Sequence, residues 1–221
     1  MKIRRDHKQT EEIKKQQASE GWMNYTFDIA GQILSLSEHS INYGGVELSI
    51  DDIEGLKVIR TDTYTYGVWV NGTRIVELRA NNGRLRIDCS KIFPSRDKLD
   101  QLFSSALDPI WSVIGSRLIG KLLDKLANDE NVAIGGVNIN RNGVYVDGGW
   151  SFLWWKAKPR LIPWTDLKIF STEGVLYLKS ISNLQYRSEL KFNEVENSTI
   201  LDAAIRYILR DNNWKRLQTN L

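Results

Sequence analysis

The sequence has little of the residue types from which most metal and catalytic sites are built. It contains one cysteine, Cys89, and two histidines, His7 and His39, among 221 residues. A single cysteine cannot form an intrachain disulfide, and these three residues cannot supply an ordinary Cys/His zinc site. We expect Cys89, which lies in the apolar alternation of "RLRIDCSKIF", to fill the core, and His39 to be an exposed turn residue.

Several sequence signals of function are also absent. Charged residues interrupt every apolar run well before the roughly 20 residues that span a bilayer, and the N-terminus lacks the apolar core of a signal peptide. No glycine-rich phosphate loop or G-x-S-x-G elbow is present. We therefore expect a folded, soluble, cytoplasmic protein that is not an enzyme and holds no cofactor or metal. Its net charge of +3, with the basic excess in the second half, is too small to predict nucleic-acid binding.

The first half of the chain changes from a polar lead-in to a β pattern. Residues 1–24 contain too few apolar side chains to offset the entropy of ordering them. From Tyr25 the hydrophobicity alternates with period two, which is typical of half-buried strands. "QILSLSEHSINYGG" predicts a β-hairpin, and type I′ turns are predicted at Asn71-Gly72, between "YTYGVWV" and "TRIVELRA", and at Asn82-Gly83. The first half is thus predicted to be an antiparallel meander.

A long amphipathic helix is predicted to follow the meander. Apolar residues recur at spacings of three and four from Leu99 to Leu122, and Ser95 is a suitable N-cap. Pro109 should kink or split this helix, because proline removes a backbone donor and clashes with the preceding turn.

The pattern then begins again. The alternation of "VNINRNGVYVDGG" lies over that of "LSLSEHSINYGG", and "IPWTDLKIF" lies over "LSIDDIEGLKVI", which aligns Asp166 with Asp52 and Leu167 with Ile53. Two short strands, "GVLYLKS" and "YRSELKF", and a closing helix in "EVENSTILDAAIRYILRDNNW" complete the chain. Sheet followed by helix, twice, predicts an α+β protein.

The motifs "GVYV", "IPWTDLKIF", "GVLYLK" and "ILDAAIRYIL" resemble the pleckstrin-homology-like (PH-like) fold found in many bacterial proteins. The resemblance implies two tandem domains, at residues 25–131 and 132–221, each an antiparallel partial barrel with a C-terminal amphipathic helix. It also implies a non-enzymatic scaffold that binds lipids, peptides or proteins.

The candidate binding site is the stretch "GGWSFLWWKAKPRLIPW", residues 148–164, which holds four of the eight tryptophans. We expect a long hairpin with "GWSFLWW" as one strand, "KAKPR" as a basic tip and "LIPWTDLKIF" as the return strand. Tryptophan and basic side chains together suit an interface with an apolar or anionic partner. The candidate residues are Trp150, Trp154, Trp155, Lys156, Lys158 and Arg160.

Two questions about this stretch stay open in the sequence. Both apolar faces of the hairpin could instead be buried, one in the barrel and one against the long helix. The partner expected first is another protein, with an anionic lipid surface and a second copy of the chain as alternatives and nucleic acid as the least expected. In some PH domains basic residues of an early hairpin loop bind phosphoinositide headgroups, and only the placement is similar here.

The alternative function is a metal-dependent nuclease. Asp166 with Glu189 and Lys191 of "ELK" resembles the acidic residue and E-x-K pair of the restriction-endonuclease-like family, in which such residues hold Mg²⁺ and steady the attacking water. Strand alternation also explains the pair simply, as two opposite charges on one solvent face, and this interpretation is favoured.

Overall fold

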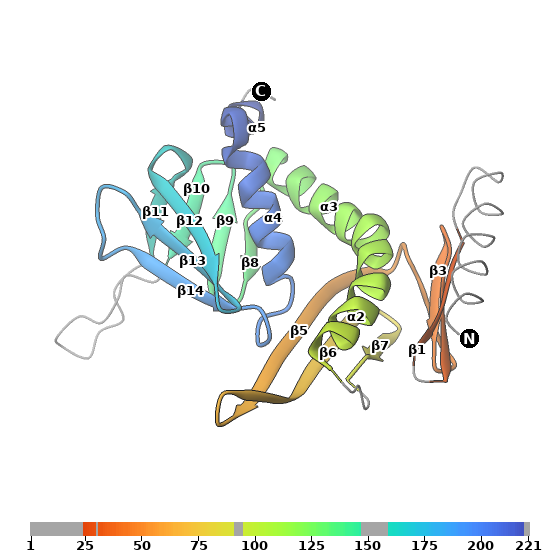
Figure 1. Cartoon of the computed structure of the whole chain (residues 1–221). Coiled ribbons are helices and arrows are strands. Elements are labelled where there is room, and N and C mark those ends of the chain that lie inside the picture. Colours follow the sequence, from red (N-terminus) through yellow and green to blue (C-terminus); the bar gives the residue numbers. More distant parts are fainter. Residues whose placement is uncertain (1–23, 30, 91–94, 147–158, 219–221) are drawn as a thin grey trace.

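The structure, a computed structural model, describes residues 24–29, 31–90, 95–146 and 159–218. It is an α+β protein with four antiparallel sheets, and no sheet closes into a barrel within these residues (Figure 1). The coarse α+β prediction is therefore confirmed. No helix in the described part of the chain is both long and apolar enough to cross a membrane.

The first half contains two sheets and a long helix. The four-stranded sheet has the order β1-β2-β3-β4 and the three-stranded sheet the order β5-β6-β7. The strands are β1 (Tyr25–Ile29), β2 (Gln32–Leu36), β3 (Ser40–Tyr43), β4 (Val46–Ser49), β5 (Ile53–Thr65), β6 (Val68–Ala80) and β7 (Gly83–Asp88). The helical segments are α2 (Arg96–Ile110), the π-helical turn η1 (Trp111–Gly115) and α3 (Ser116–Ala127).

The second half has the same order of elements, with shorter strands and a shorter helix. A four-stranded sheet, β11-β10-β9-β8, precedes a three-stranded sheet, β12-β13-β14, and then the helices. The strands are β8 (Val132–Ile134), β9 (Val137–Asn140), β10 (Gly143–Val146), β11 (Arg160–Pro163), β12 (Leu167–Thr172), β13 (Val175–Ser180) and β14 (Arg187–Lys191). The 3-10 turns η2 (Trp164–Asp166) and η3 (Arg210–Asn212) and the helices α4 (Ser198–Leu209) and α5 (Trp214–Gln218) complete it.

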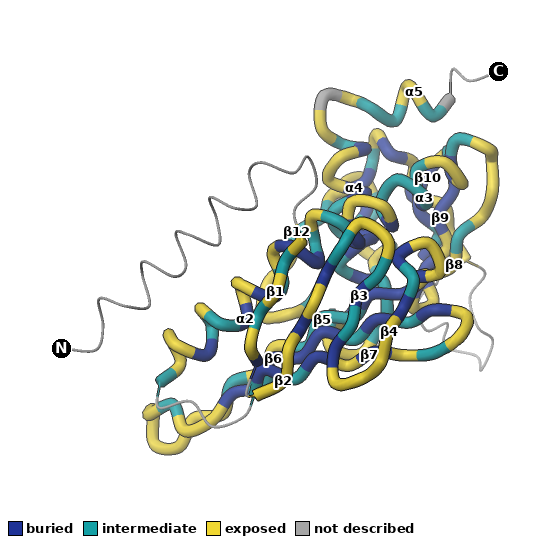
Figure 2. Tube along the Cα trace, turned by 90° about the vertical axis from the view of Figure 1, so that its right-hand side faces the viewer, coloured by how far each residue is buried: buried dark blue, intermediate teal, exposed yellow. Residues whose placement is uncertain are grey.

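The repeated sequence pattern corresponds to equivalent buried positions. Leu36 pairs with Ile41 across β2 and β3, and Ile139 pairs with Val144 across β9 and β10. All four side chains are buried, because alternate residues of a strand point to the same face. Figure 2 shows buried and exposed positions alternating along the strands.

The helix after β7 begins as predicted, and its regular α-helical part is interrupted by a π-helical turn shortly after Pro109. The Ser95 side chain accepts a hydrogen bond from the Lys98 backbone N–H, as expected of an N-cap. Pro109 lies inside α2, and the helix continues beyond it through the wider π-helical turn η1 into α3. Gly115 is the last residue of that turn, and its lack of a side chain avoids a clash, because a Cβ at this position would lie 2.9 Å from the Trp111 ring.

The predicted turn at Asn71-Gly72 is wrong. Both residues lie inside β6, and the hairpin turns at Tyr66 and Gly67, whose φ angles are 51° and 79°. Gly72 has a packing role instead, because a Cβ there would lie 2.9 Å from an Asp62 carboxylate oxygen and 3.0 Å from Leu99 of α2. The resulting β5–β6 hairpin extends beyond the rest of the sheet (Figure 1).

Two other strand predictions need correction. The β6–β7 loop consists of Asn81 and Asn82, because Ala80 pairs with Gly83, and neither asparagine has the positive φ of a type I′ turn. The return strand "LIPWTDLKIF" is broken by η2, so that β11 and β12 belong to different sheets. Trp164 forms the break: it is buried and its indole N–H donates to the Arg141 carbonyl oxygen at 2.8 Å.

The two halves meet along α3, α4 and the edge of β5. The helix α3 leaves the first half and runs beside α4 of the second (Figure 1). Asn197, the residue before α4, forms three hydrogen bonds with this edge of β5. Its backbone N–H donates to the Leu56 carbonyl at 2.9 Å, its Oδ1 accepts the Leu56 N–H at 2.9 Å, and its Nδ2 donates to the Glu54 carbonyl at 3.0 Å. One side chain thus satisfies backbone groups that an edge strand leaves unpaired.

Both minor expectations about single residues are confirmed. Cys89 is 1% exposed, and burial raises the pKa of its thiol to about 12. His39 is exposed in the turn between β2 and β3.

Candidate anion-binding face of the second half

Of the six candidate residues, the structure describes Arg160 alone. Trp150, Trp154, Trp155, Lys156 and Lys158 lie outside the described residues. Val146 of β10 pairs with Arg160 of β11, so the stretch that contains the others leaves from and returns to adjacent strands. Arg160 is exposed, and its guanidinium carbon lies 6.0 Å from the centroid of the Tyr186 ring. Arg160 therefore joins this site to the β13–β14 loop.

Asp166 holds the β13–β14 loop in place. Its carboxylate accepts hydrogen bonds from the Ser180 hydroxyl at 2.5 Å, the Ser182 hydroxyl at 2.8 Å and the Ser182 backbone N–H at 2.8 Å. Its backbone carbonyl accepts the Ile181 N–H at 2.8 Å. The hydrogen bond from Ser180, assisted by those from Ser182, lowers the pKa of Asp166 below its usual value. This carboxylate is occupied by donors of the chain itself.

Three cations form a row across the outer face of the three-stranded sheet. Lys168 of β12 pairs with Lys179 of β13, and Lys179 pairs with Arg187 of β14. Leu167, Leu178 and Ser180, which neighbour the two lysines on their strands, are buried, so alternation directs both lysines outward. Arg187 shares their face because it pairs with Lys179. None of the three forms an ion pair within the described residues. Like charges directly opposite one another destabilise a sheet, so this basic row opposes stability.

An aromatic pair supports the central cation. Phe170 and Tyr177 are directly opposite each other, and their rings stack with centroids 4.8 Å apart and an 8° angle between the planes. The Lys179 ammonium lies 4.9 Å from the Phe170 centroid and 5.6 Å from that of Tyr177. This cation–π contact fixes the ammonium at the surface without neutralising it.

The loop beside the basic row exposes aliphatic side chains. Ile181 is 61% exposed and Leu184 75% exposed, in the loop that Asp166 holds and Arg160 contacts through Tyr186. Large aliphatic side chains at a loop tip beside cations form an amphipathic surface, which differs from an ordinary solvated sheet face.

The residues of the nuclease alternative, Asp166, Glu189 and Lys191, contact other groups of the protein or lie apart from one another. Lys191 donates to Glu194 at 2.8 Å, and Glu189 lies opposite Tyr177 on the outer sheet face. Among the described residues, no three His, Cys, Asp or Glu side chains are grouped so that they could hold a metal ion.

The basic row was not identified in the sequence. Its signal in the sequence is the outward position of the lysines in "LKIF" and "YLKS" and of the arginine in "RSELK". Alternation alone places each cation on the solvent face, but only the register of the three strands shows that the cations are neighbours.

Comparisons of the chain with protein-family models, curated proteins and solved structures found no match.

Proposed function

We propose that this protein is a non-enzymatic binding protein, built as two PH-like units, whose second unit binds anionic membrane surfaces. The repeated order of a four-stranded sheet, a three-stranded sheet and a helix supports the PH-like part of the proposal. The row of Lys168, Lys179 and Arg187 carries the functional part. An anionic surface would relieve the mutual repulsion of these cations, and each basic residue near such a surface contributes about 1 kcal/mol to binding.

The surroundings of the row favour a membrane over the other anionic partners. Ile181 and Leu184 can enter the boundary between headgroups and acyl chains while the cations stay at the headgroups. The Phe170 and Tyr177 rings stack on each other beside the Lys179 ammonium, which disfavours the open base-stacking platform of single-stranded nucleic-acid sites.

Cosedimentation with vesicles tests the proposal. The full chain should bind vesicles that contain phosphatidylserine more tightly than neutral phosphatidylcholine vesicles, and salt should weaken the binding because exposed charges are screened over about 10 Å at 0.1 M. A Lys168→Gln, Arg187→Gln variant should bind about 10- to 30-fold more weakly. The matched control is Lys98→Gln, Arg84→Gln, which removes two exposed cations of the first half and should bind as the unchanged protein does.

A second pair of variants separates lipid from protein as the partner. Ile181→Ser and Leu184→Ser should weaken vesicle binding at low and at high salt, because their contribution is apolar. Equal binding of anionic and neutral vesicles, or no binding at all, would refute the membrane assignment. Capture of an acidic protein by the same basic row, without vesicle binding, would replace it with the protein partner.

A further inference from the structure

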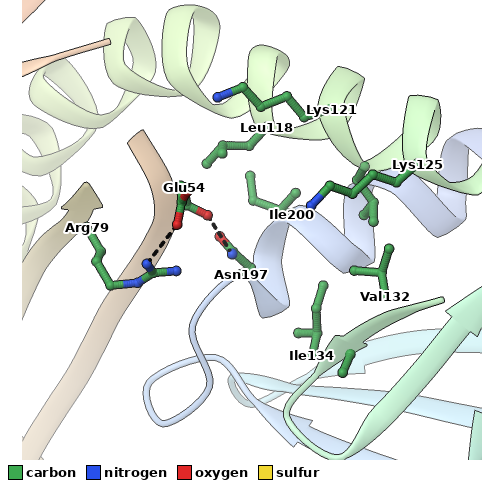
Figure 3. Close-up of a pocket in the computed structure, with 11 residues that line it drawn as sticks. Glu54, Arg79, Leu118, Lys121, Lys125, Val132, Ile134, Asn197 and Ile200 are labelled. Atoms are coloured by element: carbon green, nitrogen blue, oxygen red, sulfur yellow. Dashed lines mark hydrogen bonds and ion pairs between the residues drawn. The ribbon is translucent and has the colours of Figure 1, made fainter. Parts of the chain in front are cut away.

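A cavity at the junction of the two halves has no role in the function proposed above. Its volume is about 320 Å³, within the lower range of small-molecule sites, and sites between domains are common. The cavity lies between α3 of the first half and β8 and α4 of the second (Figure 3). Its apolar lining is contributed by Leu118, Leu122, Val132, Ile134 and Ile200.

Most polar groups of the lining already have partners. Arg79 donates to Glu54 at 3.1 Å and to Glu196 at 2.8 Å, which places it between two carboxylates. The Lys121 ammonium donates to the backbone carbonyls of Asp51 and Ile53. The side-chain amide of Asn197 is hydrogen-bonded to β5 through both its oxygen and its nitrogen. None of these groups needs a ligand to satisfy it.

Lys125 differs from the other charged residues of the lining. Its ammonium has no hydrogen bond or ion pair within the ranges that the structure describes. Figure 3 shows its exposed side chain extending from α3 toward Ile200, with the ammonium pointing in the direction of Glu54. The cavity thus combines five aliphatic side chains with one unneutralised cation, Lys125, and a Glu54 carboxylate that Arg79 neutralises.

We propose that this cavity binds a small monoanionic amphiphile, specifically a medium-chain carboxylate. The carboxylate would bind the Lys125 ammonium beside Ile200, and the chain would lie along the aliphatic side chains of the lining. Since water occupies about 30 Å³ per molecule, the volume accommodates roughly ten heavy atoms. Octanoate has this size and charge. The ligand contacts both halves and therefore stabilises their association.

Titration calorimetry with octanoate, below its micelle concentration and in the absence of vesicles, tests the proposal. We expect a Kd of roughly 1 mM or tighter, since about ten heavy atoms at ordinary ligand efficiency reach that range. Lys125→Met keeps the length of the side chain and should weaken binding about tenfold. Lys98→Met, an exposed lysine at the start of α2, is the matched control and should leave binding unchanged. Octanamide should bind about tenfold more weakly than octanoate.

A cavity-filling variant locates the ligand. Val132 is half-buried at the lining, so Val132→Trp should fill the cavity and abolish binding while the circular dichroism spectrum stays native. Equal binding of octanamide and octanoate, or unchanged binding by Lys125→Met, overturns the proposal. Unchanged vesicle binding by Lys125→Met separates this result from that of the basic row.

Discussion

The two halves repeat one order of elements but differ in whether the cations on a sheet face are buried and paired or exposed. In the first half Arg74 is completely buried, and its guanidinium donates to Asp62 and Asp100 at 2.7 Å each and to the carbonyls of Thr61 and Thr73. In the second half Lys168 and Arg187 are exposed and form no ion pair with described residues. The difference is the covering helix: α2 supplies Asp100 to Arg74, whereas no described element covers the outer face of β12–β14. The buried Arg74 is thus neutralised within the fold, whereas the exposed Lys168 and Arg187 are available to a partner.

The largest loss of stability should come from disrupting the buried network of Arg74, Asp62 and Asp100. Arg74→Met leaves Asp62 and Asp100 with only the more exposed Arg60 and Arg96 as ionic partners, and the free energy of unfolding should fall by about 3 to 5 kcal/mol. Urea unfolding followed by circular dichroism measures this loss. Arg187→Met on the uncovered face should change stability by less than about 0.5 kcal/mol.

A triple variant tests why the loss of Arg74 lowers stability. Arg74→Met with Asp62→Asn and Asp100→Asn should regain part of the lost stability, because two carboxylates that keep only the more exposed Arg60 and Arg96 as ionic partners cause much of the cost. A triple variant less stable than Arg74→Met would contradict this explanation.

The next effect concerns the junction. Asn197→Gly removes the two side-chain hydrogen bonds to β5 but tolerates the φ of 62°, and should lower the free energy of unfolding by about 1 to 3 kcal/mol. Asn197→Ala should cost about 1 kcal/mol more, because alanine is strained in the left-handed region. Thermal unfolding of both variants measures the difference, and equal stability would mean that the backbone conformation at this residue carries no cost.

A smaller effect should appear in the pH dependence of the second half. Because the pKa of Asp166 is lowered by the Ser180 and Ser182 hydrogen bonds, its contribution is present above the usual aspartate pKa, near 4, and is lost as the pH falls through the folded-state pKa. The stability difference between the unchanged protein and Asp166→Asn should therefore shrink on acidification from pH 6 to pH 3. Denaturant unfolding at each pH checks this, and a difference that grows toward acid would contradict the assignment.

The smallest expected effect is a gain in stability. Lys168→Thr removes a like charge opposite Lys179 and places a β-branched residue in a strand, so stability should rise by about 0.2 to 1 kcal/mol. Vesicle binding should weaken in the same variant. A loss of stability would show that Lys168 has a structural partner and would weaken the case for a functional row.

The sequence predicted those features that depend on local pattern. The alternation around Leu36 and Ile139, the Ser95 cap and the burial of Cys89 all follow from period, turn chemistry and hydrophobicity. Turn positions were predicted less well: Gly72 has the local signature of a turn, but its lack of a side chain is needed where α2 crosses the hairpin. A single sequence does not show whether a glycine serves a turn or a close contact.

The basic row and the junction cavity were not predicted for a similar reason. The tryptophan-rich stretch was predicted as the site from its composition, and its described residue, Arg160, lies near the Tyr186 ring in the β13–β14 loop. The row of Lys168, Lys179 and Arg187 depends on strand register, and the junction cavity depends on how α3 packs against the second half. Both are products of long-range pairing, which local periodicity does not determine.

The π-helical turn sets the rotational phase between the two halves. From Ile110 to Leu126 the buried positions of this helix recur every four residues, through Ile114, Leu118 and Leu122. An α-helix advances about 100° per residue, so a four-residue repeat drifts around the axis, and a wider turn offsets part of that drift. Deleting one residue between Trp111 and Gly115 would rotate α3 by about 100° relative to α2. The angle at which the second half faces the first is thus encoded in the length of a single helical turn, and length variants of that turn would reorient the two halves without altering any residue at their junction.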